Sequence, residues 1–316
     1  MKVSFIIPLY NCLALTQAML ASLRETMHPG LEHEIIFVDD GSTDGTRAWL
    51  TTLPAPCRIV LNDNNLGFAG ACNRGAAMAQ GEFLFFINND LVLLPHWLEP
   101  MLGAFTHFPA VGLVGNVQLQ FETHEIDHAG IVIGADGKPV HLKTRPAVSP
   151  STPGYAVMQA VTGACLAISR ELFSLLGGFD EIFKNGGEDV DLCFRARSVS
   201  RTTCTAVEST VLHHVSASPG RKIHNEENSY RLFHKWRNLL EHEAWRAWCE
   251  AYLTDSQAGT IPRNLEAEKA AEDFLHGRHT RPGCWAESNV RQNLFLEEAR
   301  WEQMFPELSN ALAASN

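Results

Sequence analysis

The chain has 316 residues, 45% of them hydrophobic, which is long enough to bury a large core and to form one large domain with an appendage. Its 25 Lys and Arg residues against 36 Asp and Glu residues give a formal net charge of -11, so a nucleic acid would be repelled and is excluded as the expected partner. The eight cysteines contain no C-x-x-C pair, which is typical of reduced thiols and predicts a cytoplasmic location.

The sequence also argues against an integral membrane protein. The apolar run that ends at Pro8 is too short for the core of a signal peptide. No other stretch approaches the roughly 18 apolar residues of a membrane span. We therefore expect at most a peripheral contact, at the inner face of a membrane.

The first 95 residues predict strands that alternate with helices. A short buried strand over 3–7 is followed by a helix that we expect Asn11 to cap. Further strands are predicted at 35–38, 58–61 and 83–87, with helices through 49–50 and over 69–79. This alternation is typical of βαβ units and predicts a mainly parallel sheet with right-handed crossovers.

The pattern changes after Pro95. Extended runs are predicted at 111–117, 126–133 and 157–169, with a proline-rich loop over 139–153 that we expect to be exposed and mobile. Acidic residues open a predicted helix over 188–198, as the helix dipole favours. Two apolar stripes at helical spacing, containing most of the tryptophans, predict a helical extension over 221–316.

Acidic side chains follow two of the predicted strands, at the edge where open α/β sheets bind their ligands. Asp39 and Asp40 precede a glycine turn, and Asn88-Asn-Asp90 is suited to holding a divalent ion against a diphosphate. Each motif also fits an ordinary cap or turn. A calcium loop starting at Asp40 is disfavoured, because Thr51 replaces its last, bidentate ligand.

Two further groups carry potential chemistry. Glu188, Asp189 and Asp191 crowd one helix start, so one of them can serve as a general base. The alternative is dipole capping, with Arg195 as the ion-pair partner of Asp191. His213 follows an extended run and can complete a site centred on Asp90, although a packed histidine is the simpler interpretation.

Eight motifs together resemble the family 2 glycosyltransferases, in order and spacing, and are most similar to the bacterial rhamnosyltransferase-like branch. The resemblance covers residues 1 to about 240. The motifs are PLYN (8–11), VDDGSTD (38–44), NLGFAGACNRG (65–75), FINND (86–90), TGACLAISR (162–170), GGFD (177–180), EDVDL (188–192) and HHVSAS (213–218).

The resemblance implies an α/β GT-A fold, a Rossmann-like and mainly parallel sheet, over residues 1–220. Its nucleotide-sugar half would span about 1–95 and its acceptor half about 96–220, followed by the helical extension over 221–316. It also implies inverting transfer of a hexosyl or deoxyhexosyl group from a UDP- or dTDP-sugar. The acceptor would be a hydroxyl of a surface polysaccharide, a lipid-linked oligosaccharide or a protein.

The resemblance further implies roles for individual residues. Asp189 would be the catalytic base, with Glu188 and Asp191 on the acceptor side, and Asp90 with His213 would hold Mg²⁺ or Mn²⁺. One departure is that Asn88 stands at the first position of the family's D-x-D motif, where it can face the ribose instead. The expected nucleotide-sugar-binding residues are Pro8, Tyr10, Asp39, Asn65, Gly67, Asn73 and Asn88.

Other functions fit the sequence less well. A nucleotidyltransferase would need a glycine-rich basic loop where PLYN stands, and a dehydrogenase would need G-x-G-x-x-G after a strand. A non-catalytic nucleotide-sugar-binding or scaffold subunit of a glycosylation complex remains the alternative. The tryptophan-rich helices can serve an oligomer as well as a monomer.

Overall fold

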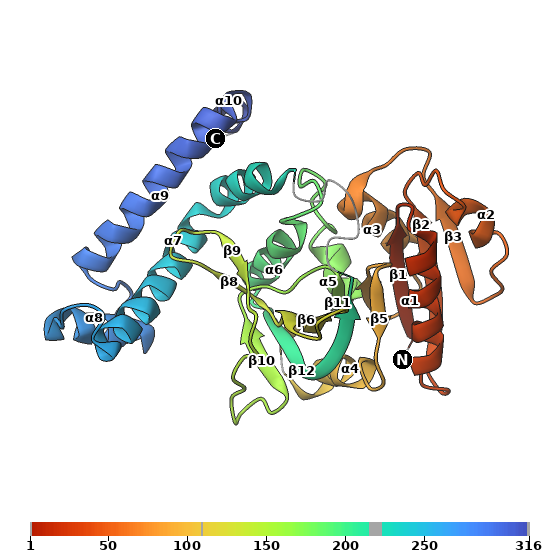
Figure 1. Cartoon of the computed structure of the whole chain (residues 1–316), viewed down its shortest axis with the longest axis horizontal. Coiled ribbons are helices and arrows are strands. Elements are labelled where there is room, and N and C mark those ends of the chain that lie inside the picture. Colours follow the sequence, from red (N-terminus) through yellow and green to blue (C-terminus); the bar gives the residue numbers. More distant parts are fainter. Residues whose placement is uncertain (1, 109, 215–222, 315–316) are drawn as a thin grey trace. The chain divides into compact units, whose positions relative to one another are not determined.

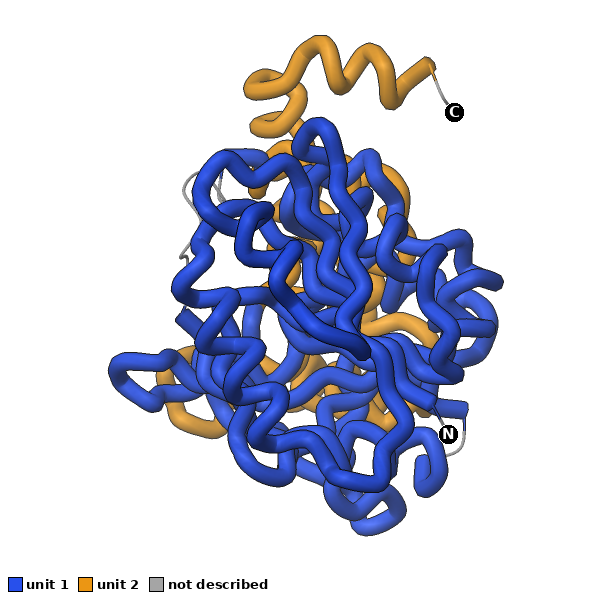
Figure 2. The backbone as a smooth tube through the Cα atoms, turned by 90° about the vertical axis from the view of Figure 1, so that its right-hand side faces the viewer, with its two compact units in different colours: residues 1–132, 141–224 blue, residues 133–140, 225–316 orange. Residues whose placement is uncertain are grey.

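The computed structural model describes residues 2–108, 110–214 and 223–314. The chain divides into two compact units, which Figure 2 shows in different colours. Unit 1 comprises Met1–Val132 and His141–His224, and unit 2 comprises Ile133–Val140 and Asn225–Asn316.

The amino-terminal half of unit 1 is a βαβ array, as the hydrophobic pattern predicts (Figure 1). Strand β1 pairs in parallel with both β2 and β4, and β2 pairs in parallel with β3. The elements are β1 (Lys2–Leu9), α1 (Leu13–Thr26), β2 (Glu32–Asp39), α2 (Thr46–Leu50), β3 (Cys57–Leu61), α3 (Gly67–Met78) and β4 (Phe83–Ile87).

The second half of unit 1 extends the same sheet, whose order is β10-β12-β6-β11-β4-β1-β2-β3. Strand β11 runs antiparallel to both β4 and β6, and β12 runs parallel to β6. The elements are β5 (Leu91–Leu93), α4 (Leu98–His107), β6 (Val111–Gln120), β7 (Ile126–His128), β10 (Tyr155–Met158), β11 (Cys165–Ser169), α5 (Arg170–Leu175), α6 (Glu188–Ser198) and β12 (Thr202–His213). Strands β8 (Ile131–Ile133) and β9 (Pro139–His141) pair with each other in a separate two-stranded sheet.

This topology fixes where ligand-binding side chains gather. Because β11 opposes both of its neighbours, β4 and β6 point the same way, and β1, β2, β3 and β12 share their direction. The carboxyl ends of these six strands therefore lie along one edge of the sheet. The predicted mainly parallel α/β architecture is confirmed.

The core of unit 1 lies against the central strands, which are continuous apolar runs because they are buried on both faces. Phe5 of β1, Phe85 of β4 and Trp97 form a mutual aromatic contact, with ring centroids 5.7 to 6.2 Å apart. Each of these side chains is at most 1% exposed, and each burial contributes about 1.5–3 kcal/mol. On α3, a Cβ at Gly75 would lie 2.5 Å from Ile6, so the absent side chain lets the helix approach the sheet closely.

Several expected elements differ in the structure. Asn11 does not cap α1: it has a positive φ, and its side-chain oxygen accepts from the Thr43 and Asp44 amides instead. Asp44 supplies the missing cap, accepting from the Leu13 amide across 3.2 Å. The expected extended run at 126–133 is interrupted at Gly130, whose φ is +136°.

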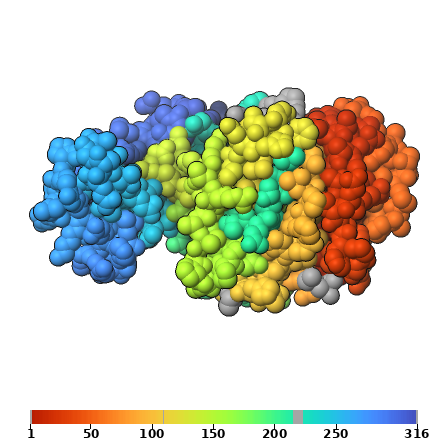
Figure 3. Space-filling view, turned by 60° about the horizontal axis from the view of Figure 1, so that its bottom comes forward, coloured from red at the N-terminus to blue at the C-terminus, as the bar shows by residue number. Residues whose placement is uncertain are grey.

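Three further differences concern the middle of the chain. The run expected at 157–169 is divided between β10 and β11, and α4 was not predicted, although Leu98, Met101 and Ala104 mark its buried face. The start of the predicted proline-rich loop, Pro139–His141, forms the short strand β9. Most of the remainder of that loop is exposed and belongs to the yellow-green surface of unit 1 in Figure 3.

Unit 2 consists mainly of helices, as predicted for the carboxyl-terminal extension. The helices are α7 (Asn225–Ala258), α8 (Leu265–Leu275), α9 (Cys284–Met304) and α10 (Pro306–Ala314), with a break in helical geometry at Trp236 inside α7. Trp301 of α9 packs on Tyr230 and Phe233 of α7 with ring centroids 5.7 and 5.6 Å apart.

The segment 133–140 also belongs to unit 2, which the sequence did not indicate. The ammonium group of Lys138 lies 2.5 Å from a carboxylate oxygen of Glu297 and 5.3 Å from the ring centre of Trp301. Gly137 lies so close to α9 that an added Cβ would be 2.6 Å from Leu294. These contacts hold the segment 133–140 against helix α9.

Candidate functional site

The candidate site lies at the carboxyl edge of the parallel strands in unit 1. Asp39 ends β2, Asp90 follows β4, and His213 ends β12. The amino end of α6 joins the same edge, because Asp189 accepts from the amide of Gly163, just before β11, across 2.9 Å. The strand order thus brings acids from the ends of different strands to one edge of the sheet.

Asp39 has one engaged and one free oxygen. Its carboxylate is fully buried, and Oδ2 accepts from Nε of Arg47 at 2.6 Å and from the Ser42 amide at 3.3 Å. Oδ1 has no hydrogen-bond partner in the described part of the chain. A buried carboxylate oxygen without a partner is costly, so this atom is suited to accept a hydrogen bond from a ligand.

The neighbouring Asp40 has a structural role. Its Oδ1 accepts from the side-chain amide of Asn62 and the backbone amide of Leu66, and its Oδ2 accepts from the Gly67 amide, over 2.7 to 2.9 Å. Asp40 therefore holds the loop that contains the predicted nucleoside-binding residues Asn65 and Gly67.

The other predicted nucleotide-binding residues occupy different environments. Tyr10 is 47% exposed directly after β1, while Pro8 is half-buried within that strand. Asn65 is exposed at the loop surface, with its side-chain oxygen on the Gly67 amide. The side chain of Asn73 instead bonds to the backbone of Phe179 and to Glu181. Their contact with a nucleotide stays a prediction.

Asp90 and His213 are brought together by strand pairing. His213 is the register partner of Leu91, and its Nε2 lies 3.4 Å from Oδ1 of Asp90. The two side chains are 4% and 6% exposed, yet neither ring nitrogen nor that oxygen has a hydrogen-bond partner among the described residues. An imidazole and a carboxylate with unused lone pairs are a donor set that suits Mn²⁺ or Mg²⁺.

The protein supplies few ligands for such an ion. Within residues 2–108, 110–214 and 223–314, no group of three or more His, Cys, Asp or Glu side chains is arranged to hold a metal. Asn88 replaces a possible carboxylate, and its backbone amide donates to the carbonyl of Ala164. A cation held here would complete its coordination with water and phosphate oxygens, as Mg²⁺ sites commonly do.

The three acids of α6 separate into different roles. The Asp189 carboxylate accepts from the Gly163 amide at 2.9 Å and from the Val190 amide at 2.8 Å, and its side chain is partly exposed. Asp191 is completely buried and lies 2.7 Å from Nε of Arg195, the ion pair that helical spacing predicts. Glu188 is buried and accepts from the Gly186 amide. Asp189 is thus the acid of this helix best placed to meet a substrate.

Sequence reasoning missed three contributors to the site. Arg47 donates a hydrogen bond to Asp39. In the sequence, the only indication of this contact is that Arg47 lies one helical turn past the Asp-rich loop. His128 contacts Thr162, and the turn 162–164 contacts Asp189 through the Gly163 amide. The turn lies within the TGACLAISR motif, but the sequence indicated no role for it in the site, and no motif contains His128.

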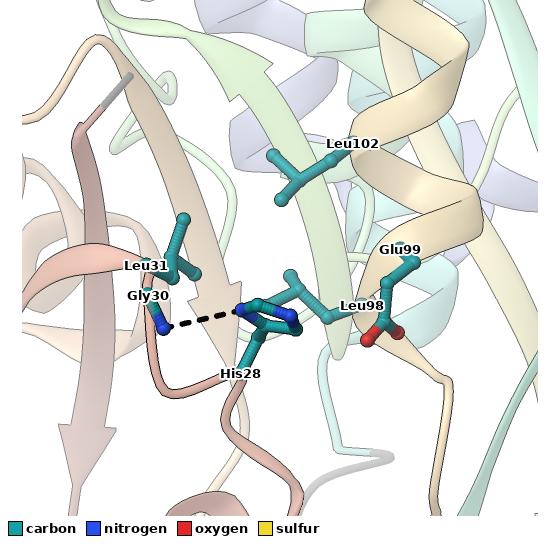
Figure 4. Close-up of a pocket in the computed structure, with 6 residues that line it drawn as sticks. All are labelled: His28, Gly30, Leu31, Leu98, Glu99 and Leu102. Carbon is teal, nitrogen blue, oxygen red and sulfur yellow. Dashed lines mark hydrogen bonds between the residues drawn. The ribbon is translucent and has the colours of Figure 1, made fainter.

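One small pocket lies elsewhere in unit 1. It has a volume of about 180 Å³ and is lined by the six residues in Figure 4, from the loop between α1 and β2 and the start of α4. His28 accepts from the Gly30 amide at its rim. This loop precedes β2, so the pocket lies at the amino ends of the parallel strands, opposite the candidate site.

The sheet topology and the acids at its carboxyl edge define a GT-A glycosyltransferase fold. The structure of GalNAc-T7 with UDP, GalNAc and Mn²⁺ matches 87% of this chain and 54% of its own, with a TM-score of 0.62 and 17% identity. The mannosyltransferase PcManGT from Pyrobaculum calidifontis, in complex with GDP-Man and Mn²⁺, matches 99% of this chain and 80% of its own, with a TM-score of 0.51 and 21% identity.

The family model for glycosyl transferase family 2 matches residues 4–173, and the chain belongs to this family. The O-antigen biosynthesis protein RfbC of Myxococcus xanthus is 34% identical over 74% of this chain, but this chain spans only 19% of that protein. The N-acetylglucosaminyl-diphospho-decaprenol L-rhamnosyltransferase of Mycobacterium tuberculosis is 26% identical over 72% of this chain and 80% of its own length. The resemblance to the rhamnosyltransferase-like branch is thereby confirmed.

None of the helices in the described part of the chain is both long and apolar enough to cross a membrane.

Proposed function

We propose that this chain is an inverting glycosyltransferase that moves a sugar from a nucleoside-diphosphate donor to an acceptor hydroxyl in glycan biosynthesis. The observation that carries the proposal is the buried Asp90 and His213 pair, whose facing atoms have no partners, at the same sheet edge as Asp39 and Asp189. Family membership supports the reaction class.

In the proposed reaction, Asp189 is the general base. Its carboxylate takes the proton of the acceptor hydroxyl while that oxygen forms a bond to the anomeric carbon of the donor. The bond between that carbon and the diphosphate breaks, and the nucleoside diphosphate leaves with the electron pair. The backbone amides of Gly163 and Val190 fix the carboxylate, so little reorganisation is needed at the moment of transfer.

Asp90 and His213 would hold Mg²⁺ or Mn²⁺ against the diphosphate. The bound cation would supply charge stabilisation of the leaving group. The buried, unpartnered atoms of these two side chains support this assignment, since a bound cation would satisfy them. Asn88 would then be free to face the ribose.

The donor is proposed to carry uracil or thymine. Arg47 engages Oδ2 of Asp39, which leaves Oδ1 to accept the N3–H of either base. Cytosine presents an acceptor at that position and would be opposed by the carboxylate. The name of the mycobacterial relative supports a deoxyhexose as the transferred sugar and a lipid-linked acceptor. The proposed acceptors also include a surface polysaccharide and a protein. A cytoplasmic location, a peripheral membrane contact and oligomers through the carboxyl-terminal helices stay predictions.

The test is calorimetric binding of UDP, dTDP, GDP and CMP to the purified chain, each with and without Mn²⁺. We expect metal-dependent binding of UDP or dTDP, lost in Asp90→Ala and kept in Glu82→Gln, an exposed acid at the opposite edge of the sheet. No binding of any nucleotide would remove the donor site and favour a scaffold subunit instead.

A further inference from the structure

His128 is a buried histidine that the proposed reaction does not use. It ends β7 beside Gln118 of β6, and its side chain is 1% exposed. Burial, with added repulsion from His141 and His213, lowers the pKa of His128 well below 6.5. The ring is therefore neutral at neutral pH, with one nitrogen that donates and one that accepts.

The accepting nitrogen of His128 is defined by its surroundings. Nε2 accepts from the backbone amide of Thr162, 34 residues away in sequence, across 3.4 Å. Nδ1 must then carry the proton, and it has no hydrogen-bond partner among the described residues. An unpaired buried donor costs about 1–3 kcal/mol, so an apolar side chain would suit the stability of the fold better than histidine does. This cost points to a role outside stability.

The residues that follow Thr162 connect the parts of the candidate site. The Gly163 amide donates to Oδ2 of Asp189 across 2.9 Å. The carbonyl of Ala164 accepts from the Asn88 amide across 2.8 Å, at the loop that carries Asp90. A Cβ at Gly163 would lie 3.0 Å from the ring of Phe68, so this turn is closely confined.

We propose that His128 is a positioning residue for Asp189, acting through the turn formed by Thr162, Gly163 and Ala164 (the 162–164 turn). The ring nitrogen fixes the Thr162 amide, and with it the direction in which the next amide, that of Gly163, donates to the Asp189 carboxylate. This inference rests on the proposed function of Asp189 as the base. A displacement of a catalytic group by about 1 Å can lower the reaction rate about 100-fold. A weak hydrogen bond to His128 is therefore sufficient to affect turnover if it fixes the position of the Asp189 carboxylate.

The test compares two substitutions. His128→Leu fills the site but removes the acceptor, whereas His128→Gln keeps an acceptor oxygen near the position of Nε2. We expect His128→Leu to lower turnover about 10- to 100-fold, measured as nucleoside diphosphate released from the UDP- or dTDP-sugar that binds. UDP or dTDP affinity with Mn²⁺ should stay within about twofold, and His128→Gln should recover most of the turnover.

A second measurement does not need a donor. Amide hydrogen exchange of the peptide that spans 162–164 should be faster in His128→Leu than in the unchanged chain, and near normal in His128→Gln. Thermal unfolding of both variants checks that each is folded. Unchanged exchange in a folded His128→Leu protein would overturn the proposal.

Combining variants separates this inference from the proposed function. In an Asp189→Asn background, adding His128→Leu should cause no further loss, because both changes act on one carboxylate. If Asp189→Asn itself keeps full turnover, the assignment of the base fails. If Asp189→Asn is inactive but His128→Leu has normal turnover, only the positioning role of His128 fails. The same holds if His128→Leu lowers nucleotide affinity as much as it lowers turnover.

Discussion

The Nε2 atom of His213 lies 3.4 Å from Oδ1 of Asp90, and both atoms are buried without a hydrogen-bond partner in the described chain. Two backbone features hold this pair: His213 is in register with Leu91, and the His214 amide donates to the Asp90 carbonyl across 3.0 Å. The pair is therefore built into the pairing of β5 with β12.

This arrangement predicts the effect of removing the imidazole. His213→Ala should weaken Mn²⁺ binding in the presence of UDP by at least about tenfold, because one of the two proposed protein ligands is lost. Titration calorimetry with Mn²⁺ checks this, with His279→Ala as a control at an exposed histidine of unit 2. Equal Mn²⁺ affinity in both variants would contradict the assignment.

Asp189→Asn should lower turnover about 100- to 10,000-fold, since an amide cannot take the acceptor proton. The side chain keeps its size, and its oxygen can still accept from the Gly163 amide, so nucleotide affinity should not change. Parallel measurement of nucleotide release and of calorimetric affinity distinguishes the two effects. A comparable fall in both would show that Asp189 serves binding and not proton transfer.

Asp191→Asn should lower the stability of the fold, whereas Asp189→Asn should lower turnover. The carboxylate is fully buried and pairs with Arg195, so its neutralisation leaves a guanidinium group without its counter-charge. We expect a loss of about 3–5 kcal/mol in the free energy of unfolding, measured with urea. Glu25→Gln, at an exposed acid of α1, provides the control. A stable but inactive Asp191→Asn protein would instead support its predicted place on the acceptor side.

Asp39→Asn should change which base is bound. In this variant, Arg47 should still donate to the side-chain oxygen of residue 39, so the amide NH₂ group would face the nucleobase. That donor opposes N3–H of uracil and matches N3 of cytosine. We expect UDP affinity to fall about tenfold, near 1.4 kcal/mol, while CMP affinity rises. Asp63→Asn, at an exposed loop position, should leave the preference for UDP unchanged.

Glu34 should contribute to the acid sensitivity of the fold. Burial raises its pKa, but hydrogen bonds from Arg58, the Gln80 amide and Ser4 outweigh burial and leave the pKa below its ordinary value of 4.5. A depressed carboxyl pKa stabilises the fold fully above pH 4.5 and loses that contribution as the pH falls through the lower, folded-state pKa.

Glu34→Gln should therefore be less stable than the unchanged chain near pH 7, with a difference that shrinks as the pH falls below 4.5. Urea unfolding across this pH range measures the effect. A constant difference at every pH would mean that the loss comes from packing and not from the charge of Glu34.

The alternation of strands and helices in unit 1 was predictable because hydrophobic periodicity is local. Runs such as Phe83–Ile87 record burial on both faces, and the helix over Glu188–Ser198 matches its predicted bounds. Caps and short elements were less predictable. The side chain that caps α1 is Asp44 and not the predicted Asn11, because the capping oxygen comes from a loop 31 residues away along the chain.

The sequence alone indicated the fold class, the family and the acids at the ends of β2 and β4, because hydrophobic periodicity and short motifs are each read from residues close together in the chain. Only the tertiary structure decided that β11 enters antiparallel between β4 and β6. It also decided that His128 contacts Thr162. Strand order sets these contacts, and no local pattern encodes strand order, because partners in a sheet are chosen by packing across the whole domain.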